Sequence, residues 1–490
     1  MKKLLGTTLA LAMFVPAGAN AELLKNLKVS GNLDIQTTSA RNVADFATRP
    51  NTASGGSGEP AGTAARSYND RIGHANTRVI VKLDWDVLDD VHARVTLVKG
   101  AVAADTRVYG GAAENLNTIQ TNTLLQEANV KIDKVMGLLD VTAGRQFYGE
   151  EGDLIVYYGP RDAYGQRVDA IDMFRADWNG EHMSVTGIAG KTADTLVTGL
   201  GNAATDLRGV IVSCKMHEMV KPSAYVYNRV THATGGSGAS VPNNAGVVNG
   251  KNTNLWVTGL KAKVAVGGLT ASVEYAKNFG EDRATFNNGG LGPQSGSFKG
   301  WAFQTKAAYK VDLDNVGALN PWGEFGMGTG DANFAHAGNG EFQSINTDYR
   351  PGGIYGRFDQ GAAISLGQGI NNNGAARNSG GASNGLSNRV IWGFGLKATP
   401  SAVNKLTVGA AFYRYAFHRV APNTAAASTK TSRNIGTEID VTGEWKHSEN
   451  VSLTATAGTF QPGQYIRHLK GPDAIVNPAI MLAGDVKIKF

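Results

Sequence analysis

Charged side chains recur at every second position in several segments of the chain. Arg78 and Lys82 follow this spacing in one segment, and Lys306 and Lys310 follow it in another. Residues at alternate positions of an extended strand share one face. Each such face therefore carries charge along its length and must contact water or a polar solute. The face also mixes basic and acidic residues, which predicts electrostatic contact with a solute rather than covalent chemistry.

The segment Phe147–Gln166 gathers carboxylates, an arginine and tyrosines within twenty residues. The charged and aromatic residues that we single out there are Glu150, Glu151, Asp153, Tyr157, Arg161 and Asp162. They stand between two predicted strands, so they belong to a loop. This loop either folds inward and narrows a channel or forms an external lid.

No motif for catalysis or for metal binding stands in the sequence in the context that its chemistry requires. The G-x-S-x-G match at Gly381–Gly385 lies within the long glycine-rich loop and not directly after a predicted strand, the nine histidines are scattered, and Cys214 is the only cysteine. The run that begins at Asp312 has Val316 and Gly323 where a calcium loop has its third Asp or Asn and its closing Glu. The sequence has no cluster of basic residues of the kind that would indicate nucleic-acid binding. We therefore expect no catalytic residue, no bound metal and no cofactor.

The composition limits which elements can hold these charged faces. Glycine makes up 63 of the 490 residues, close to twice the usual ~7%. The mean hydropathy is −0.20, which disfavours a bundle of transmembrane helices. Strict alternation of apolar and polar residues indicates strands instead. We count about eighteen such strands, as many as the larger outer-membrane barrels contain. They are expected near residues 27–38, 76–87, 91–99, 124–133, 138–146, 167–178, 182–190, 207–217, 222–230, 254–266, 269–279, 299–311, 319–329, 388–398, 405–415, 435–446, 451–460 and 479–490.

The connections between these segments alternate between short and long. Leu88–Asp90 and His447–Asn450 are short, whereas Ser39–Ala75 and Gly330–Ser387 are long. Short turns on one rim and long loops on the other are typical of a transmembrane, antiparallel, up-and-down β-barrel. We therefore predict an all-β chain that forms a single barrel of about eighteen strands in the outer membrane.

Both ends of the chain agree with export to an outer membrane. Residues 1–21 have two lysines, an apolar core and an Ala-Asn-Ala site, which predicts a cleaved signal peptide. Residues 22–490 then form the barrel domain. The last predicted strand ends at Phe490 and resembles the terminal strand that barrel-insertion machinery recognises in bacterial outer-membrane proteins. Membrane lipid and that machinery are the expected partners.

Two segments resemble the alginate-export family of eighteen-stranded porins. One has the pattern of Gly144, Arg145, Gln146, Gly152, Asp153, Arg167 and Asp169. The other runs from Ile435 to Asp440 and continues to Gly458–Gly463. The resemblance covers about a quarter of the chain and implies a porin. The family name implies export of an anionic polysaccharide for some members.

The alternation assigns a set of charged side chains to the lumen. The residues expected to line the pore are Arg78, Lys82, Arg94, Glu127, Lys131, Arg167, Asp169, Lys306, Lys310, Glu438 and Asp440. Because both signs are present, we expect passive diffusion of small hydrophilic solutes with a weak preference for anions. Two alternatives stay open: a selective channel or exporter for an anionic saccharide, and a plugged barrel that acts as an adhesin or structural protein. A long inward loop, for which Gly330–Ser387 has the length, would mark the plugged barrel. The sequence does not give the oligomeric state.

Overall fold

The computed structural model describes residues 26–43, 71–100, 123–193, 196–197, 201–202, 205–232, 252–282, 296–331, 338–358, 385–419, 432–470 and 476–490. The proposed signal peptide lies outside these residues.

Eighteen antiparallel strands form a closed ring. In order around the ring they are β1 (Lys28–Arg41), β2 (Arg71–Leu88), β3 (Val91–Lys99), β4 (Leu124–Val135), β5 (Leu139–Gln146), β8 (Ile171–Asn179), β9 (Met183–Ala193), β12 (Thr205–Cys214), β13 (Val220–Thr231), β14 (Thr253–Val266), β15 (Leu269–Asp282), β17 (Trp301–Tyr309), β19 (Gly317–Gly328), β21 (Arg389–Pro400), β22 (Leu406–Phe417), β23 (Asn434–Lys446), β24 (Val451–Pro462) and β25 (Ala479–Lys489). The ring closes where β1 pairs with β25, from Asn32 opposite Lys489 to Arg41 opposite Ile480.

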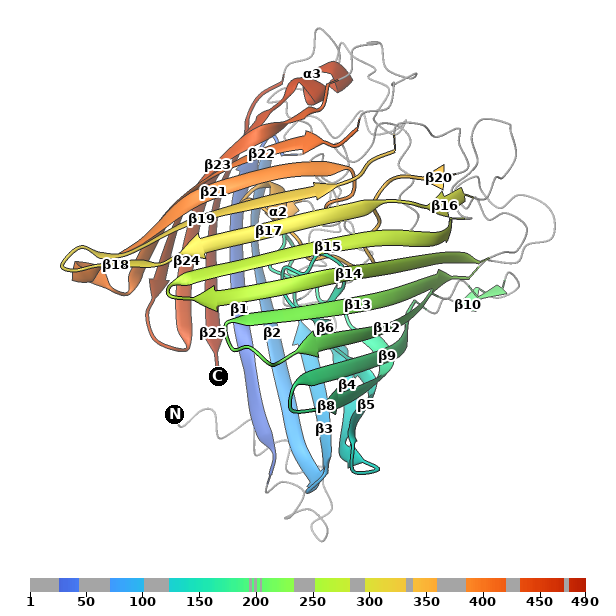
Figure 1. Ribbon diagram of the computed structural model, residues 1–490. Coiled ribbons are helices and arrows are strands. Elements are labelled where there is room, and N and C mark those ends of the chain that lie inside the picture. Colours follow the sequence, from blue (N-terminus) through green and yellow to red (C-terminus); the bar gives the residue numbers. More distant parts are fainter. Residues whose placement is uncertain are drawn as a thin grey trace.

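Shorter strands and helices are present in addition to the eighteen ring strands. They are β6 (Tyr148–Gly149), β7 (Tyr157–Tyr158), β10 (Leu196–Val197), β11 (Gly201–Asn202), β16 (Gly296–Phe298), β18 (Val311–Leu313), β20 (Gly338–Asn339), α2 (Tyr355–Phe358), η2 (Ser401–Val403) and α3 (Gln464–Lys470). Figure 1 shows the strands tilted around the ring, with β6 and α2 seen within it. None of the helices in the described part of the chain is both long enough and apolar enough to cross a bilayer.

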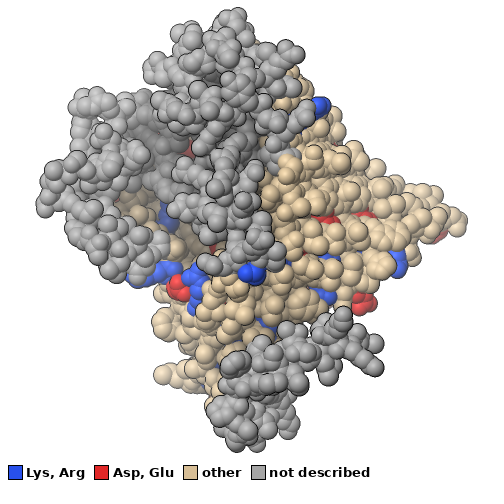
Figure 2. Space-filling view, turned by 180° about the vertical axis from the view of Figure 1, so that it is seen from behind, with Lys and Arg blue, Asp and Glu red and all other residues tan. Residues whose placement is uncertain are grey.

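The two faces of the wall differ as the alternation predicts. In β23, Ile439 and Val441 are 53% and 55% exposed, whereas Glu438 and Asp440 are buried on the inner face. Large apolar side chains are exposed around the outside, as Phe174, Leu260 and Leu482 illustrate. Figure 2 shows that uncharged residues cover most of the described wall on one side, with charged residues in small, separate groups. An apolar exterior around a polar interior is the pattern of a barrel surrounded by lipid.

The predicted fold class is confirmed, and each predicted strand overlaps one strand of the ring. The boundary near residue 167 is wrong, because β8 begins at Ile171. Residues 167–170 complete a loop that enters the lumen, so Arg167 and Asp169 stand on that loop and not on the wall.

Candidate functional site: a constriction built by two inward segments

The first inward segment is the connection between β5 and β8. Tyr148 pairs with Tyr158 across the β6–β7 ladder. Between them, Leu154, Ile155 and Val156 are at most 2% exposed. Apolar residues in a loop become this buried only when they pack against the barrel interior and a second segment. The structure therefore places Phe147–Gln166 inside the lumen rather than over it as an external lid.

The second inward segment comprises residues 338–358, which follow β19. It lies beside the first segment, and Val156 and Asn346 form a parallel bridge. The Tyr157 amide donates to the Asn346 carbonyl at 2.8 Å, and the Asn346 side chain donates to the Tyr157 carbonyl at 2.7 Å. The two segments thus form one joined body within the barrel, although about 190 residues separate them in sequence.

Arg161 holds the two segments together. Its guanidinium donates to the Asp348 carboxylate at 2.8 Å and to the Thr347 carbonyl at 2.7 Å. It also donates to Asp169 at 3.1 Å, and Asp169 in turn accepts from Arg167 at 2.6 Å. The Arg161 side chain is 1% exposed. A buried guanidinium that is fully paired contributes to the rigidity of the loops and cannot contact a passing solute.

The residues of the family-like motif are mainly structural in this chain. Gly144 has φ +119°, and a Cβ there would lie 2.3 Å from the Ala128 carbonyl oxygen. The Gly152 amide donates to Asp348 at 2.9 Å. Buried Gln146 donates to the Met173 carbonyl at 3.2 Å. These contacts position the first inward segment.

Arg145 and Asp172 interrupt the alternation in the sequence, which suggested a bulge or a misplaced strand. The strands β5 and β8 instead pair there without a register shift. Arg145 donates to Asp172 at 2.9 Å, and both lie on the face opposite buried Gln146 and Ile171. The two charges compensate each other on the outer wall.

Lumen charges of the wall anchor the first segment. Arg78, 2% exposed, donates to Asp34 at 2.6 Å and to the carbonyls of Arg161 and Gln166 at 2.9 and 3.1 Å. Lys487 pairs with Asp162. On the opposite wall, Lys261 pairs with Asp153 at 2.9 Å, and Lys263 pairs with Glu150. The lysine and arginine anchors favour the ionised forms of Asp162 and Glu150. Burial opposes the charge of Asp162, but Lys487 and Arg78 hold its pKa below the ordinary value. Lys263 and Lys261 likewise outweigh burial and lower the pKa of Glu150.

Glu438 and Asp440 anchor the second segment. Glu438 accepts hydrogen bonds from the amides of Ile354 and Tyr355 at 2.6 and 3.1 Å and from the Tyr415 hydroxyl at 3.1 Å. Asp440 accepts from the Gly353 amide at 2.8 Å. These carboxylates are 0% and 3% exposed, so they do not face the open pore as expected. The inward segment covers them.

The other predicted pore residues remain on the inner wall, most of them paired. Arg94 donates a hydrogen bond to the Asp84 carboxylate at 2.5 Å, and Lys131 forms an ion pair with Asp133 at 2.5 Å. Buried Glu127 accepts from Thr96 at 2.6 Å and from the Phe147 amide at 3.1 Å. Lys310 is an exception, because it lies between β17 and β18 and not on a ring strand; it pairs with Asp312 at 2.9 Å. Lys82 lies opposite Ser30 and Thr96 in the neighbouring strands.

A cavity of about 500 Å³ lies between the two inward segments and the wall. The first segment contributes Glu151, Gly152 and Asp162, the second contributes Asp348–Pro351, and the wall contributes Lys306, Glu324 and Tyr413. Arg350 is held by Asp348 at 2.9 Å and lies 3.9 Å from Glu151. Both signs of charge therefore border this passage.

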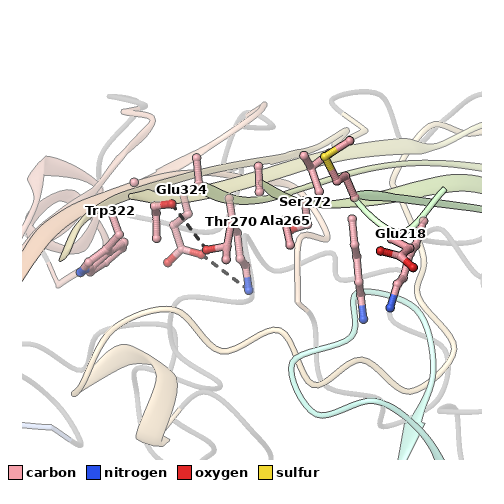
Figure 3. Close-up of a pocket in the computed structure, with 15 residues that line it drawn as sticks. Glu218, Ala265, Thr270, Ser272, Trp322 and Glu324 are labelled. Carbon is pink, nitrogen blue, oxygen red and sulfur yellow. Dashed lines mark hydrogen bonds and ion pairs between the residues drawn. The ribbon is translucent and has the colours of Figure 1, made fainter. Parts of the chain in front are cut away.

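Two further cavities continue along the inner wall. One of about 500 Å³ shares Lys306 and Glu324 with the passage, and one of about 770 Å³ shares Lys221 and Lys263 with that cavity. Figure 3 shows Trp322 and Glu324 toward one end and Glu218 toward the other, with side chains below the sheet on the side of the inward segments. Lys306 is 42% exposed and lies 3.9 Å from Glu324. The loosely paired Lys306 is thus available to a solute.

Sequence reasoning missed much of the passage. Arg350 and Tyr349 belong to the second inward segment, which carries no periodic pattern in the sequence. Glu324 and Lys487 lay on predicted strands, but the sequence did not place them at the constriction. The only signal was the length of Gly330–Ser387.

No family model matches the chain, and no curated protein matches its sequence. Solved structures with a similar fold do exist. OpdQ of Pseudomonas aeruginosa is 10% identical, with 96% of this chain and 99% of that chain covered and a TM-score of 0.51. OccK10 (OpdN) of the same organism is 8% identical, with 94% and 99% covered and a TM-score of 0.50. The comparisons do not support the alginate-export family in particular. What the likeness establishes is the fold, an eighteen-stranded barrel of the porin kind.

Proposed function

We propose that the chain is an outer-membrane channel for passive diffusion of small hydrophilic solutes, with a weak preference for anions. The observation that carries this proposal is the series of cavities that share lining residues along the inner wall and past the two inward segments. Such a lumen, inside a wall with an apolar exterior, suits passage of solutes across a membrane.

The weak preference follows from how the charges are paired. Most lumen cations are held by carboxylates, and Arg78 and Arg161 are buried. Lys306 is 42% exposed and only loosely paired on the inner wall, whereas the similarly exposed Lys263 is paired with Glu150. Because salt screens charges over ~8–10 Å, such cations in a water-filled passage produce only a shallow potential.

The plugged barrel has one observation in its favour, because residues 338–358 do fold inward. The cavity beside them argues for a narrowed channel instead. Export of an anionic polysaccharide would require a continuous run of unpaired cations, and the paired charges of this lumen disfavour it.

The experiment is planar-bilayer conductance of the refolded chain in a salt gradient, with liposome swelling in neutral sugars. We expect a measurable conductance, an anion-to-cation permeability ratio modestly above one that falls as salt rises, and entry of small neutral sugars. A barrel without conductance would support the plug. A channel closed to neutral sugars yet blocked by micromolar oligo-uronate would support polysaccharide export.

A further inference from the structure

Trp322 faces the lumen, unlike the other tryptophans of the ring. The chain has seven tryptophans, and each stands on a described strand of the ring. Six occupy outward positions of the alternation, where barrels carry aromatic girdles at the membrane interfaces; they are Trp85, Trp178, Trp256, Trp301, Trp392 and Trp445. Trp322 instead shares the face of Glu324, two residues along β19, and Figure 3 shows both side chains on the side of the sheet that the inward segments occupy. Anchoring in the membrane therefore does not account for this indole.

The wall beside Trp322 carries no side chains that would displace its ring. Gly395 on β21 lies directly opposite Trp322, and a Cβ there would lie 2.8 Å from the indole. One pair farther along β21, Gly393 lies opposite Tyr413 on β22, and a Cβ at Gly393 would lie 2.5 Å from the phenol ring. The indole and the phenol therefore lie over the bare backbone of β21. Their centroids are 5.8 Å apart, so the two rings form one aromatic surface on the inner wall.

This aromatic surface borders the space through which a solute can pass. Trp322 lines one cavity of about 500 Å³ and Tyr413 lines the other, and the two cavities share Lys306 and Glu324. Both volumes fall in the ~300–1,000 Å³ range of small-molecule sites. Glu324 lies two residues from Trp322 on the same face, which is ~6.6–6.8 Å along a strand, and Lys306 lies directly opposite Glu324. A carboxylate and an ammonium group therefore stand at the edge of the aromatic surface.

The combination of ring faces and paired charges indicates the class of solute. The face of an aromatic ring carries partial negative charge, which attracts the C–H bonds on the face of a pyranose ring. The hydroxyl groups around a pyranose both donate and accept hydrogen bonds, so they can donate to Glu324 and accept from Lys306. Because the two charged groups have opposite signs, they favour a solute without net charge.

We propose that Trp322 and Tyr413 form a stacking site for a neutral pyranose sugar, with Glu324 and Lys306 binding its hydroxyl groups. This inference rests on the proposed channel function, because a solute reaches Trp322 only through the lumen. It adds to that function a solute class that the channel binds as well as admits.

The competing explanation is that the indole only fills space in the wall. The test is a ligand-detected NMR titration of the refolded full-length chain with methyl α-glucopyranoside. Sorbitol is the comparator, because it has the hydroxyl groups of a hexose but no ring face, and benzoate is the probe for an aromatic anion. The variants are Trp322→Leu, Trp322→Phe and Tyr413→Leu, with outward Trp392→Leu as the matched control. Barrel closure is checked for each variant by its unheated gel migration.

We expect the glucopyranoside to bind the parent chain and sorbitol to bind about tenfold more weakly, since a stacked ring accounts for most of the difference. Trp322→Leu should weaken glucopyranoside binding about tenfold, whereas Trp322→Phe should lose less because it keeps a ring. Tyr413→Leu should also weaken binding, and Trp392→Leu should bind as the parent chain does.

Equal binding of the glucopyranoside and sorbitol would overturn the stacking site, and that comparison does not depend on the folding of any variant. Parent-like binding in Trp322→Leu, or tighter binding of benzoate than of the glucopyranoside, would also overturn it. Conductance in salt without sugar is measured on the same preparations. A chain that conducts but does not bind the glucopyranoside would refute the stacking site and leave the channel proposal standing. A chain that binds it through Trp322 but does not conduct would refute the channel proposal and leave the stacking site standing.

Discussion

Replacing Glu438 by alanine should release the second inward segment from the wall. The side chain accepts the amides of Ile354 and Tyr355 and the hydroxyl of Tyr415, and it is fully buried. A buried donor left without its acceptor costs about 1–3 kcal/mol. Three donors together correspond to about 3–9 kcal/mol, reduced where lumen water reaches them. We take about 3 kcal/mol as a working value, which shifts the docking equilibrium roughly 100-fold because each ~1.4 kcal/mol is a factor of ten.

The assay combines hydrogen exchange with single-channel recording. Exchange of the amides of residues 353–355 should accelerate by about two orders of magnitude, since exchange reports local opening free energy. Open-channel current should become noisier as the segment moves in the passage. The barrel itself should remain closed, because the ladders of β23 do not depend on this side chain.

Glu444→Ala provides the matched control for that variant. Glu444 stands on the same strand and the same face, and its ion-pair partner is Lys446 at 3.9 Å. It should leave exchange at residues 353–355 and current noise unchanged. Unchanged exchange in Glu438→Ala, or equal effects of the two variants, would refute the assignment of Glu438 as the anchor of this segment.

Three further predictions concern the wall, the passage and pH. Arg at outward Val441 should lower unfolding free energy by about 2–4 kcal/mol, while Arg at inward Thr442 should be tolerated; equal effects in denaturant titrations would show that the faces are reversed. Lys306→Gln should lower the anion-to-cation permeability ratio without closing the channel to neutral sugars, whereas Lys310→Gln should change the ratio less, because Asp312 already compensates it; reversal potentials decide between them. Because Lys487 and Arg78 lower the pKa of Asp162 in the folded state, its contribution to loop docking is fully present above the ordinary aspartate pKa and is lost progressively as pH falls from that value through the lowered one. Current noise should therefore stay constant on mild acidification and rise only below the ordinary aspartate pKa, and a rise well above that pKa would contradict this.

The strands could be predicted from sequence because their signal is local. A wall between lipid and water requires a change of polarity at each residue, so every strand carries its own period of two. The positions of Ile439 and Val441 on the outer face follow from that period alone. The same argument gave the approximate strand number and the side of the wall on which Lys306 lies.

Only the tertiary structure determined which inward charges meet a solute. Arg78, Glu438 and Asp440 have the same periodicity as Lys306, yet they are buried beneath inward segments whereas Lys306 is 42% exposed. Whether these side chains are buried depends on where the inward segments lie, and contacts such as that of Arg161 with Asp348, 187 residues away, determine this. The path of a loop across the lumen depends on many such distant pairings, and local periodicity carries no information about them. The sequence therefore determined the barrel wall, and the tertiary structure determined the passage through it.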